Sequence, residues 1–340
     1  MHSHRGTTKS TIAIVGGESL LGKEVRELME GSDLRAGVTM IASDETEGSS
    51  VISIRREEPE VINPLQVSDV KSVKVAVLAG SRESSSKAYE EIHKSAPGVA
   101  FVDLSGALED RPEARLVAPI VESSGVAGSS SIWVIAHPAA IALGLFLTQL
   151  QKIVKIRRSV IDIFEPVSER GKAGIDELQK QTVGLLSFKP VPKELYDAQI
   201  SFNMLSQYGE ESPHSLGAIE QTIDRHLASL LAGAGSIPMP SLRLIQAPVF
   251  HGYSMSLWIE FEGNPEIETI QRGIASSHID VRTSEHEPPT NVGVAGQSGI
   301  TVGSIAVDRN DPRACWFWVV ADNLRLAAQN AVEVTREVLK

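Results

Sequence analysis

The fold is decided by the stretch Ser10-Thr-Ile-Ala-Ile-Val15, which is followed directly by Gly16-Gly-Glu-Ser-Leu-Leu-Gly22. The first part is a short apolar run of the kind found in a strand that is buried on both faces. The second part is a glycine turn, and residues 23–29 after it carry apolar side chains at helical spacing. A strand, a glycine turn and a helix in this order predict the start of a doubly wound, nucleotide-binding sheet.

Outward from this stretch, apolar strand-like runs alternate with helical segments as far as residue 136. The alternation predicts parallel strands joined by right-handed crossovers. Beyond residue 136 the strands become longer and several alternate polar with apolar residues, which predicts an α+β domain. The expected strands are 10–15, 38–43, 73–79, 99–103, 132–136, 158–164, 242–249, 254–261, 300–307 and 315–321, and the main helices are 23–29, 84–95, 171–186, 216–231 and 322–339.

The expected fold class is therefore α/β, a doubly wound Rossmann-type parallel sheet with a second α+β domain. The first domain is expected to comprise residues 8–136 and 322–340, and the second residues 137–321. The Ser- and Gly-rich segment Ser124–Ser131 is the expected flexible link between them.

Composition excludes several functional classes. The 340 residues hold 32 Lys and Arg against 43 Asp and Glu, a net charge of −11, which argues against a nucleic-acid-binding surface. The single cysteine, Cys315, forms no internal disulfide or Cys-based zinc site, and no His, Asp or Glu spacing suggests another metal site. The sequence contains no run of about 18 apolar residues, so no membrane span is predicted. Its start lacks the apolar core of a signal peptide, and a cytoplasmic location is expected.

The glycine turn by itself supports two interpretations. Gly16 and Gly22 hold the outer positions of a G-x-x-G-x-x-G loop, which lets a pyrophosphate approach the backbone at a helix N-terminus. Ser19 holds the middle position and is expected to crowd that approach, while Glu18 adds negative charge where an anion would bind. This stretch alone supports a dinucleotide site and a plain tight turn equally.

Nine patches in order, from about residue 10 to residue 340, resemble motifs of the aspartate-semialdehyde dehydrogenase family. Val15–Gly22 resembles the VGATGxVG loop, Phe101–Ala107 the VIDxSxAF segment, Leu116–Val121 LVVPEVN, Ile135–Ala140 ANPNC, Gly171–Gln181 GxxGxxELxxQ, Phe202–Met204 AFN, Ala247–Ser254 VPVFxGHS, Pro289–Thr290 with Val302–Ser304 the PTP and VGR elements, and Val320–Arg325 VSDNLRKGAA.

The resemblance implies a Rossmann-type domain, a dimerisation domain and the NADP- and phosphate-dependent interconversion of L-aspartate 4-semialdehyde and 4-phosphoaspartate in amino-acid biosynthesis. In the family a cysteine thiolate attacks the carbonyl carbon and a histidine handles the proton. The position of that cysteine holds Ala140 here, and a methyl group cannot act as the nucleophile. Cys315 lies in an apolar strand and is predicted to be a buried core residue.

Other positions that the resemblance assigns to the family's chemistry have changed as well. Each of the following residues replaces a family residue at the matching motif position. Tyr253 replaces the general-base histidine, Gln246 the substrate arginine, Glu165 the acyl-positioning glutamine, His137 and Glu122 two asparagines, and Glu109 a second arginine. The family's phosphate-binding lysine has no counterpart, because no lysine occurs between Lys193 and Lys340. His137 and His251 are the conceivable substitutes for the lost groups; His251 and Tyr253, two residues apart on an expected strand, would share a face.

These changes predict a catalytically silent homodimeric paralogue, or a chain that pairs with an active relative. The alternative is an active semialdehyde dehydrogenase-like oxidoreductase with a different nucleophile or substrate, and a third interpretation is a NAD(H)-responsive binding protein. The sequence leaves open whether the protein is an enzyme. The apolar strands around Trp258 and Trp316 suit a dimerisation sheet and an ordinary core equally.

The cofactor expectation is NAD or NADP, bound weakly, with NAD favoured. The family grips the 2′-phosphate of NADP with a Ser-x-Arg-Ser sequence, whereas this chain reads Ser43-Asp-Glu-Thr46 and would repel it. An acid there could instead bind the ribose 2′-hydroxyl of NAD. The expected cofactor-binding residues are Gly16, Glu18, Ser19, Leu20, Gly22, Ser43, Gly80 and Asn323.

Overall fold

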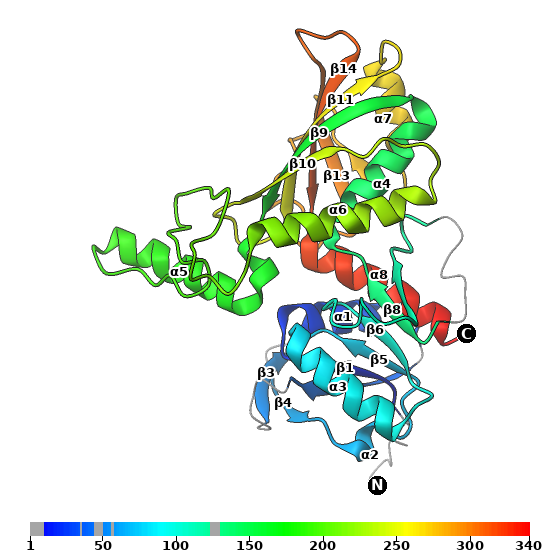
Figure 1. The fold of residues 1–340 in the computed structure, drawn as a ribbon, viewed down its shortest axis with the longest axis vertical. Helices are drawn as coiled ribbons and strands as arrows, with labels where there is room; N and C mark the ends of the chain where they lie inside the picture. The colour runs from blue at the N-terminus through cyan, green and yellow to red at the C-terminus, as the bar shows by residue number, and fades with distance from the viewer. Residues whose placement is uncertain (1–9, 35, 44–49, 56–57, 123–129) are drawn as a thin grey trace. The chain divides into compact units, whose positions relative to one another are not determined.

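The computed structural model of the chain describes residues 10–34, 36–43, 50–55, 58–122 and 130–340. The chain divides into two compact units (Figure 1). The first is built from residues up to 119, from 124–136 and from 327–340, and the second from residues 120–123 and 137–326. None of the helices among the described residues is long and apolar enough to cross a membrane.

The first unit contains an eight-stranded sheet in the order β3-β4-β2-β1-β5-β6-β8-β7. Every pair of neighbouring strands is parallel except β3 and β4. The elements are β1 (Ser10–Val15), α1 (Leu20–Gly31), β2 (Gly37–Ala42), β3 (Val51–Arg55), β4 (Glu58–Pro64), α2 (Val67–Val70), β5 (Val75–Leu78), α3 (Arg82–Ser95), β6 (Ala100–Asp103), β7 (Ala114–Val117) and β8 (Ile132–Ile135). The predicted doubly wound arrangement is therefore confirmed.

The core of the first unit explains why its strands read as continuous apolar runs. Ile12, Ala13 and Ile14 of β1 are completely buried, as expected for a parallel strand with both faces covered. The antiparallel pair β3–β4 is an addition that the sequence did not predict. Pro59 and Pro64 lie within β4, and prolines, which cannot donate to a ladder, weaken the strand signal of that segment.

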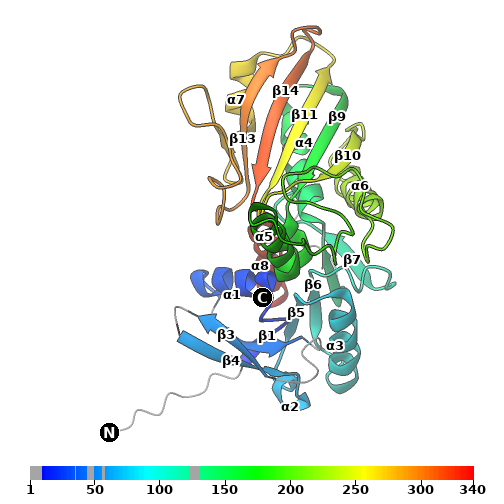
Figure 2. The ribbon, with the colours of Figure 1, turned by 90° about the vertical axis from the view of Figure 1, so that its left-hand side faces the viewer.

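The second unit contains a six-stranded mixed sheet in the order β10-β9-β11-β14-β13-β12 (Figure 2). Helices α4, α6 and α7 pack together and against this sheet. The elements are α4 (Pro138–Ile153), β9 (Ile156–Glu165), the 3₁₀ turn η2 (Val167–Arg170), α5 (Gly171–Leu186), α6 (Leu216–Ala232), β10 (Ser241–Gln246), β11 (Tyr253–Phe261), α7 (Ile267–Ile274), β12 (Ile279–Val281), β13 (Ile300–Val307), β14 (Ala314–Ala321) and the first turn of α8 (Asn323–Val338).

Helix α4 was not predicted, and its composition explains why. Residues 139–147 are all buried, so the segment is apolar on every side and shows no helical periodicity. Strands β9, β11 and β14 differ from α4 in that buried positions are interrupted by more open ones along each strand. This leaves a visible pattern in their sequences. The open positions include Val160, which is 48% exposed, and Trp316, which is 44% exposed.

Candidate functional site

A cluster of buried polar side chains lies in the second unit, beside the N-terminus of α4 and the C-terminal end of β9. It brings together predicted site residues and residues that the sequence did not single out. Its members are His137, Glu165, Glu169, Arg170, Tyr196, Tyr208, His226, Gln246, Tyr253 and Asn323. We refer to this set as the polar cluster.

No thiol takes part in the polar cluster. Ala140 lies in the first turn of α4, completely buried, where the resemblance places a nucleophile. Cys315 lies on β14, also completely buried, and burial raises the pKa of its thiol to about 11. The prediction that Cys315 is a core residue is thus confirmed, and such a thiol is almost entirely protonated at neutral pH.

His137 is the N-cap of α4 and faces a carboxyl group. Its Nδ1 accepts the N–H of Ala139 at 3.3 Å, and its own backbone N–H donates to Nδ1 of His226 at 2.9 Å. Its Nε2 lies 3.9 Å from Oε2 of Glu169. Burial, together with His226 and Arg170, lowers the pKa of His137 to about 3, so the imidazole is neutral at physiological pH.

Glu169 is held by Asn323. The Asn323 Oδ1 accepts the backbone N–H of Gly252 at 3.0 Å, which fixes the orientation of the amide, and its Nδ2 donates to Oε1 of Glu169 at 2.7 Å. Burial and the nearby Glu165 raise the pKa of Glu169 to about 7, against the opposing effects of Arg170 and the Asn323 hydrogen bond. The sequence did not predict Glu169 as a site residue.

Glu165 forms a buried ion pair with Arg170. The Nη2 of Arg170 donates to Oε1 of Glu165 at 2.7 Å, and the two side chains are 15% and 0% exposed. Tyr208 donates to Oε1 of Gln246 at 2.7 Å, and Nε2 of Gln246 donates to the backbone oxygens of Glu165 and Ala247. Glu165 and Gln246, predicted from their motif positions, are therefore neighbours in the structure.

Several buried polar atoms of the polar cluster have no hydrogen-bond partner within the described part of the chain. They are Oε2 of Glu165, Nε of Arg170 and the hydroxyl oxygens of Tyr196 and Tyr253. Burial, reinforced by Glu169 and Glu165, raises the pKa of Tyr253 well above its usual value, so its hydroxyl keeps its proton. Unpartnered buried polar groups are rare, and a bound molecule or water is one of the ordinary explanations for them.

The expectation that His251 and Tyr253 share a strand face is wrong. Strand β11 begins at Tyr253, and Gly252 before it has a φ of +83°, which breaks the alternation of a strand. The ring of Tyr253 lies 6.0 Å from that of His137, whereas the backbone oxygen of His251 accepts a hydrogen bond from Nδ2 of Asn291. Of the two predicted substitutes, the structure brings only His137 into the polar cluster.

In the first unit, glycine is required at both ends of the predicted loop. Gly16 has a φ of +77°, and a Cβ there would lie 2.4 Å from the backbone nitrogen of Gly80. A Cβ on Gly22 would lie 2.3 Å from the oxygen of Gly16. Ser19 is the N-cap of α1: its Oγ accepts the N–H of Gly22 at 2.8 Å and donates to the oxygen of Ala79 at 2.9 Å.

The N-terminus of α1 offers donors to a ligand. The N–H of Ser19 is bonded to the oxygen of Gly16, but among the described residues no acceptor meets the N–H groups of Leu20 and Leu21. Free N–H groups at a helix N-terminus bind phosphate oxygens. The loop therefore fits the pyrophosphate of a dinucleotide.

Glu18 is directed to the end of β2 rather than to the helix N-terminus. Its Oε1 accepts the backbone N–H of Ser43 at 3.0 Å and also the Ser43 hydroxyl. In doubly wound folds, an acid at the end of this strand contacts the ribose of the nucleotide. Asp44 and Glu45, predicted to act there, lie outside the described residues.

The other predicted positions lie as follows. Asn323, expected at the cofactor, is 1% exposed, and its amide is bonded within the second unit. Glu109 lies 3.7 Å from Nη2 of Arg82 in the first unit. No group of three His, Cys, Asp or Glu side chains suited to a metal occurs among the residues that the structure describes.

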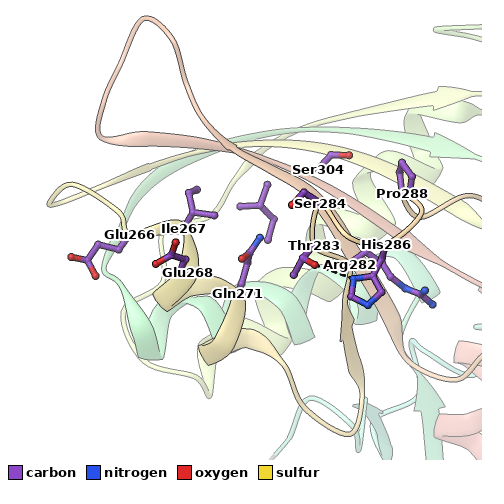
Figure 3. A pocket seen from close by; sticks show the side chains of 11 residues that line it. Glu266, Ile267, Glu268, Gln271, Arg282, Thr283, Ser284, His286, Pro288 and Ser304 are labelled. Carbon is purple, nitrogen blue, oxygen red and sulfur yellow. Dashed lines mark hydrogen bonds between the residues drawn. The ribbon is translucent and has the colours of Figure 1, made fainter.

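A surface hollow of about 910 Å³ lies elsewhere in the second unit (Figure 3). Polar and charged side chains from α7 and from residues 282–288 line much of it, and Thr283 Oγ1 lies 3.0 Å from Nδ1 of His286. None of its lining residues belongs to the polar cluster. The hollow is also open to solvent, and the polar cluster remains the candidate site.

Sequence reasoning missed Glu169, Arg170, Tyr196, Tyr208 and His226. A signal for the first two was present, because two charged residues follow a buried strand end and directly precede the helix that begins at Gly171. Tyr196, Tyr208 and His226 gave no such signal, since each is brought to the polar cluster by tertiary packing alone.

Comparisons with known proteins agree with this architecture. The chain matches the family model "Semialdehyde dehydrogenase, NAD binding domain" over residues 11–129 and "Semialdehyde dehydrogenase, dimerisation domain" over residues 147–326. It is 30% identical to a "USG-1 protein homolog" of Pseudomonas aeruginosa over 97% of each chain. It is 26% identical to an "Aspartate-semialdehyde dehydrogenase" of Rickettsia bellii over 98% of this chain and 99% of that one.

The fold is also similar to a solved structure. A probable aspartate-semialdehyde dehydrogenase from Pseudomonas aeruginosa superimposes with a TM-score of 0.83 and 27% sequence identity. The similarity covers 97% of this chain and 98% of that one.

Proposed function

Because the chain belongs to the semialdehyde dehydrogenase family, we propose that it is a homodimeric, nicotinamide-binding paralogue that does not carry out the family's thiol-dependent reaction. The family predicted from the sequence motifs is confirmed by the two matching family models. Its relatives include named aspartate-semialdehyde dehydrogenases, so the chain is an aspartate-semialdehyde dehydrogenase-like oxidoreductase.

The observation that carries the proposal is the residue at the start of α4. Thioester chemistry needs a thiolate within reach of the substrate carbonyl, and Ala140 provides only a methyl group. The thiol of Cys315 is completely buried in β14, and its pKa of about 11 leaves about one thiolate in ten thousand molecules at neutral pH. Neither residue supplies the nucleophile.

We expect the purified protein to show no phosphate-dependent reduction of NADP with aspartate 4-semialdehyde. The absorbance of NADPH should stay at the level of the enzyme-free sample, while an active relative assayed in parallel produces it. Iodoacetamide should leave Cys315 unmodified in the folded protein and alkylate it after unfolding, as read by mass spectrometry. Turnover that disappears in a Cys315→Ser variant would contradict the proposal.

The cofactor proposal is that a nicotinamide dinucleotide binds the first unit, with NAD preferred over NADP. The N–H groups of Leu20 and Leu21 would hold its pyrophosphate, and when bound it would supply a hydride acceptor. The carboxylate of Glu18 lies at the end of β2, and Asp44 and Glu45 add negative charge to the same segment of sequence. A 2′-phosphate near these groups meets electrostatic repulsion, whereas a ribose hydroxyl does not.

Replacing Glu18 by alanine should raise the affinity for NADP relative to that for NAD by about tenfold, or about 1.4 kcal/mol. The reason is that the substitution removes the carboxylate fixed beside Ser43. Calorimetric titration with each dinucleotide measures the ratio. Glu27→Ala, which removes the same charge from an exposed position on α1, is the matched control. An equal shift in both variants would show that net charge, rather than position, sets the preference.

The homodimer is proposed to form through the second unit, whose sequence matches the dimerisation domain of the family. One face of its sheet carries the open positions of β9, β11 and β14. On it, the indole N–H groups of Trp258 and Trp316 both donate to Asp308, at 2.9 and 2.8 Å. Trp316 remains 44% exposed, which favours a dimerisation sheet over an ordinary core. A hetero-oligomer with an active relative would use the same face.

A second function has support from a specific observation, the position of Glu169 opposite His137. An oxidoreductase that interconverts an alcohol and a carbonyl needs an acid–base group but no covalent nucleophile. The polar cluster supplies such a group in Glu169, so activity on a different substrate is the alternative to a silent paralogue.

A further inference from the structure

The facing atoms of His137 and Glu169 are separated by more than the length of a hydrogen bond. Nε2 and Oε2 lie 3.9 Å apart, which is too far for a direct hydrogen bond. An oxygen placed about 2.8 Å from each atom would bond to both and bridge the gap. Each of the two side chains is 14% exposed to solvent.

The imidazole presents a donor to this gap. Nδ1 of His137 accepts the N–H of Ala139, so in the neutral ring the proton is on Nε2. The bond from the His137 backbone N–H to His226 anchors the residue at the start of α4. The gap is thus bounded on one side by a fixed N–H donor.

The carboxyl group presents Oε2 to the same gap. Asn323 holds the other oxygen, and the Asn323 amide is itself fixed by the N–H of Gly252 and the hydroxyl of Ser168. Oε2 therefore accepts a hydrogen bond when Glu169 is ionised and donates one when Glu169 is protonated. These two states suit different ligands.

The electrostatic surroundings favour an uncharged ligand. The positive charge of Arg170 is already balanced by the buried carboxylate of Glu165, with which it forms an ion pair. The titratable and charged groups that interact with Glu169 are Glu165 on β9, Arg170 on η2, His137 at the start of α4, Tyr196 in the segment between α5 and α6, and Tyr253 on β11.

We propose that His137 and Glu169 form an acid–base site that binds the oxygen of an uncharged small alcohol or carbonyl compound between Nε2 and Oε2. Ionised Glu169 accepts the proton of a bound hydroxyl in a hydrogen bond, while Nε2–H donates to the same oxygen. Protonated Glu169 and Nε2–H together donate to a carbonyl oxygen, which has two lone pairs to accept them. The two binding modes differ by one proton on Glu169, which is exchanged with solvent.

The two modes give opposite dependences on pH. The pKa of Glu169 is about 7, so the ionised form dominates above this pH and the protonated form below it. Affinity for an alcohol should therefore rise with pH through this range, and affinity for the matching ketone should fall. Between one pH unit below and one above the pKa, the population of each form changes by roughly tenfold.

Propan-2-ol and acetone test the proposal, because each carries a single oxygen and they have nearly the same size. Saturation-transfer NMR on the full-length protein measures their binding at pH values one unit below and above the pKa of Glu169. We expect propan-2-ol to bind up to about tenfold more tightly at the higher pH and acetone up to about tenfold more tightly at the lower one. Opposite slopes in the wild-type protein support the site without any variant.

Glu169→Gln should abolish the pH dependence of both probes while retaining some binding, since glutamine keeps an oxygen acceptor and an N–H donor. Glu210→Gln, at an exposed position, should leave both slopes unchanged. Slopes of the same sign for the two probes, slopes that survive Glu169→Gln, or no saturation transfer to either probe would overturn the proposal. The assay needs no turnover, so its result is separate from the absence of thiol-dependent aldehyde oxidation.

Discussion

Replacing Arg170 by methionine is expected to lower the free energy of unfolding of the second unit by about 3–5 kcal/mol. Arg170 lies 2.7 Å from Glu165, whose side chain is completely buried. The substitution leaves that carboxylate in the core without its counter-charge, and removing one member of a buried pair is far more costly than removing both. Urea unfolding followed by tryptophan fluorescence measures the loss, because three of the four tryptophans belong to this unit.

Two further variants show whether the buried charge is the cause. Adding Glu165→Gln to Arg170→Met should recover most of the loss, since the double variant leaves no unpaired charge. Lys172→Met is the matched surface control: Lys172 is 81% exposed and lies 3.9 Å from Asp176, and such pairs contribute about 0.5 kcal/mol or less. All variants are compared at one protein concentration, because dimerisation adds to apparent stability. A loss no larger than that of Lys172→Met would refute the buried-pair interpretation.

Where the chain carries a short apolar run or apolar residues at helical spacing, its sequence predicted the element closely. Strand 10–15, helix 171–186 and strand 300–307 were predicted with the bounds that the structure shows. For helix 171–186 the information is in the periodicity, which records which side chains face the core. The same signal is missing from α4, which is buried all round, and from the proline-containing β4.

The candidate site was predictable where a motif aligned its residues and unpredictable where packing chose the partners. His137, Glu165, Gln246 and Tyr253 were named from motif positions and meet in the polar cluster. Glu169 is held opposite His137 by the side-chain amide of Asn323, whose orientation is fixed by the backbone N–H of Gly252. Both hydrogen bonds are tertiary contacts. A linear sequence carries no record of such a contact.

The same distinction applies to the glycine loop of the first unit. Its sequence predicted crowding by Ser19 and repulsion by Glu18 at the helix N-terminus. In the structure, the Ser19 hydroxyl caps α1 and the Glu18 carboxylate is bonded to Ser43. Side-chain direction, which is set by local hydrogen bonds, therefore places the negative charge at the end of β2 rather than at the helix N-terminus, and this is the basis of our proposal that Glu18 acts on the ribose.

Glu169→Gln is expected to stabilise the protein progressively as the pH rises from about 4.5 to about 7. The pKa of Glu169 is raised from 4.5 to about 7 on folding, chiefly by burial, so within this window the folded state binds more protons than the unfolded state. The wild-type protein therefore loses up to about 3 kcal/mol of stability across the window through this group. The uncharged glutamine does not incur this loss.

His137 has the opposite effect on the pH dependence of stability, so the wild-type curve must be compared with that of the variant. Its pKa is lowered from 6.5 to about 3, so its contribution makes stability rise with pH over that range and offsets Glu169 between about 4.5 and 6.5. The wild-type curve alone would look flat there, and the difference between Glu169→Gln and wild type isolates the carboxyl group. Urea unfolding at a series of pH values should show this difference growing from near zero at pH 4.5 to about 3 kcal/mol at pH 7. Glu210→Gln should show no such growth, and a constant difference for Glu169→Gln would mean that Glu169 titrates alike in the folded and unfolded states.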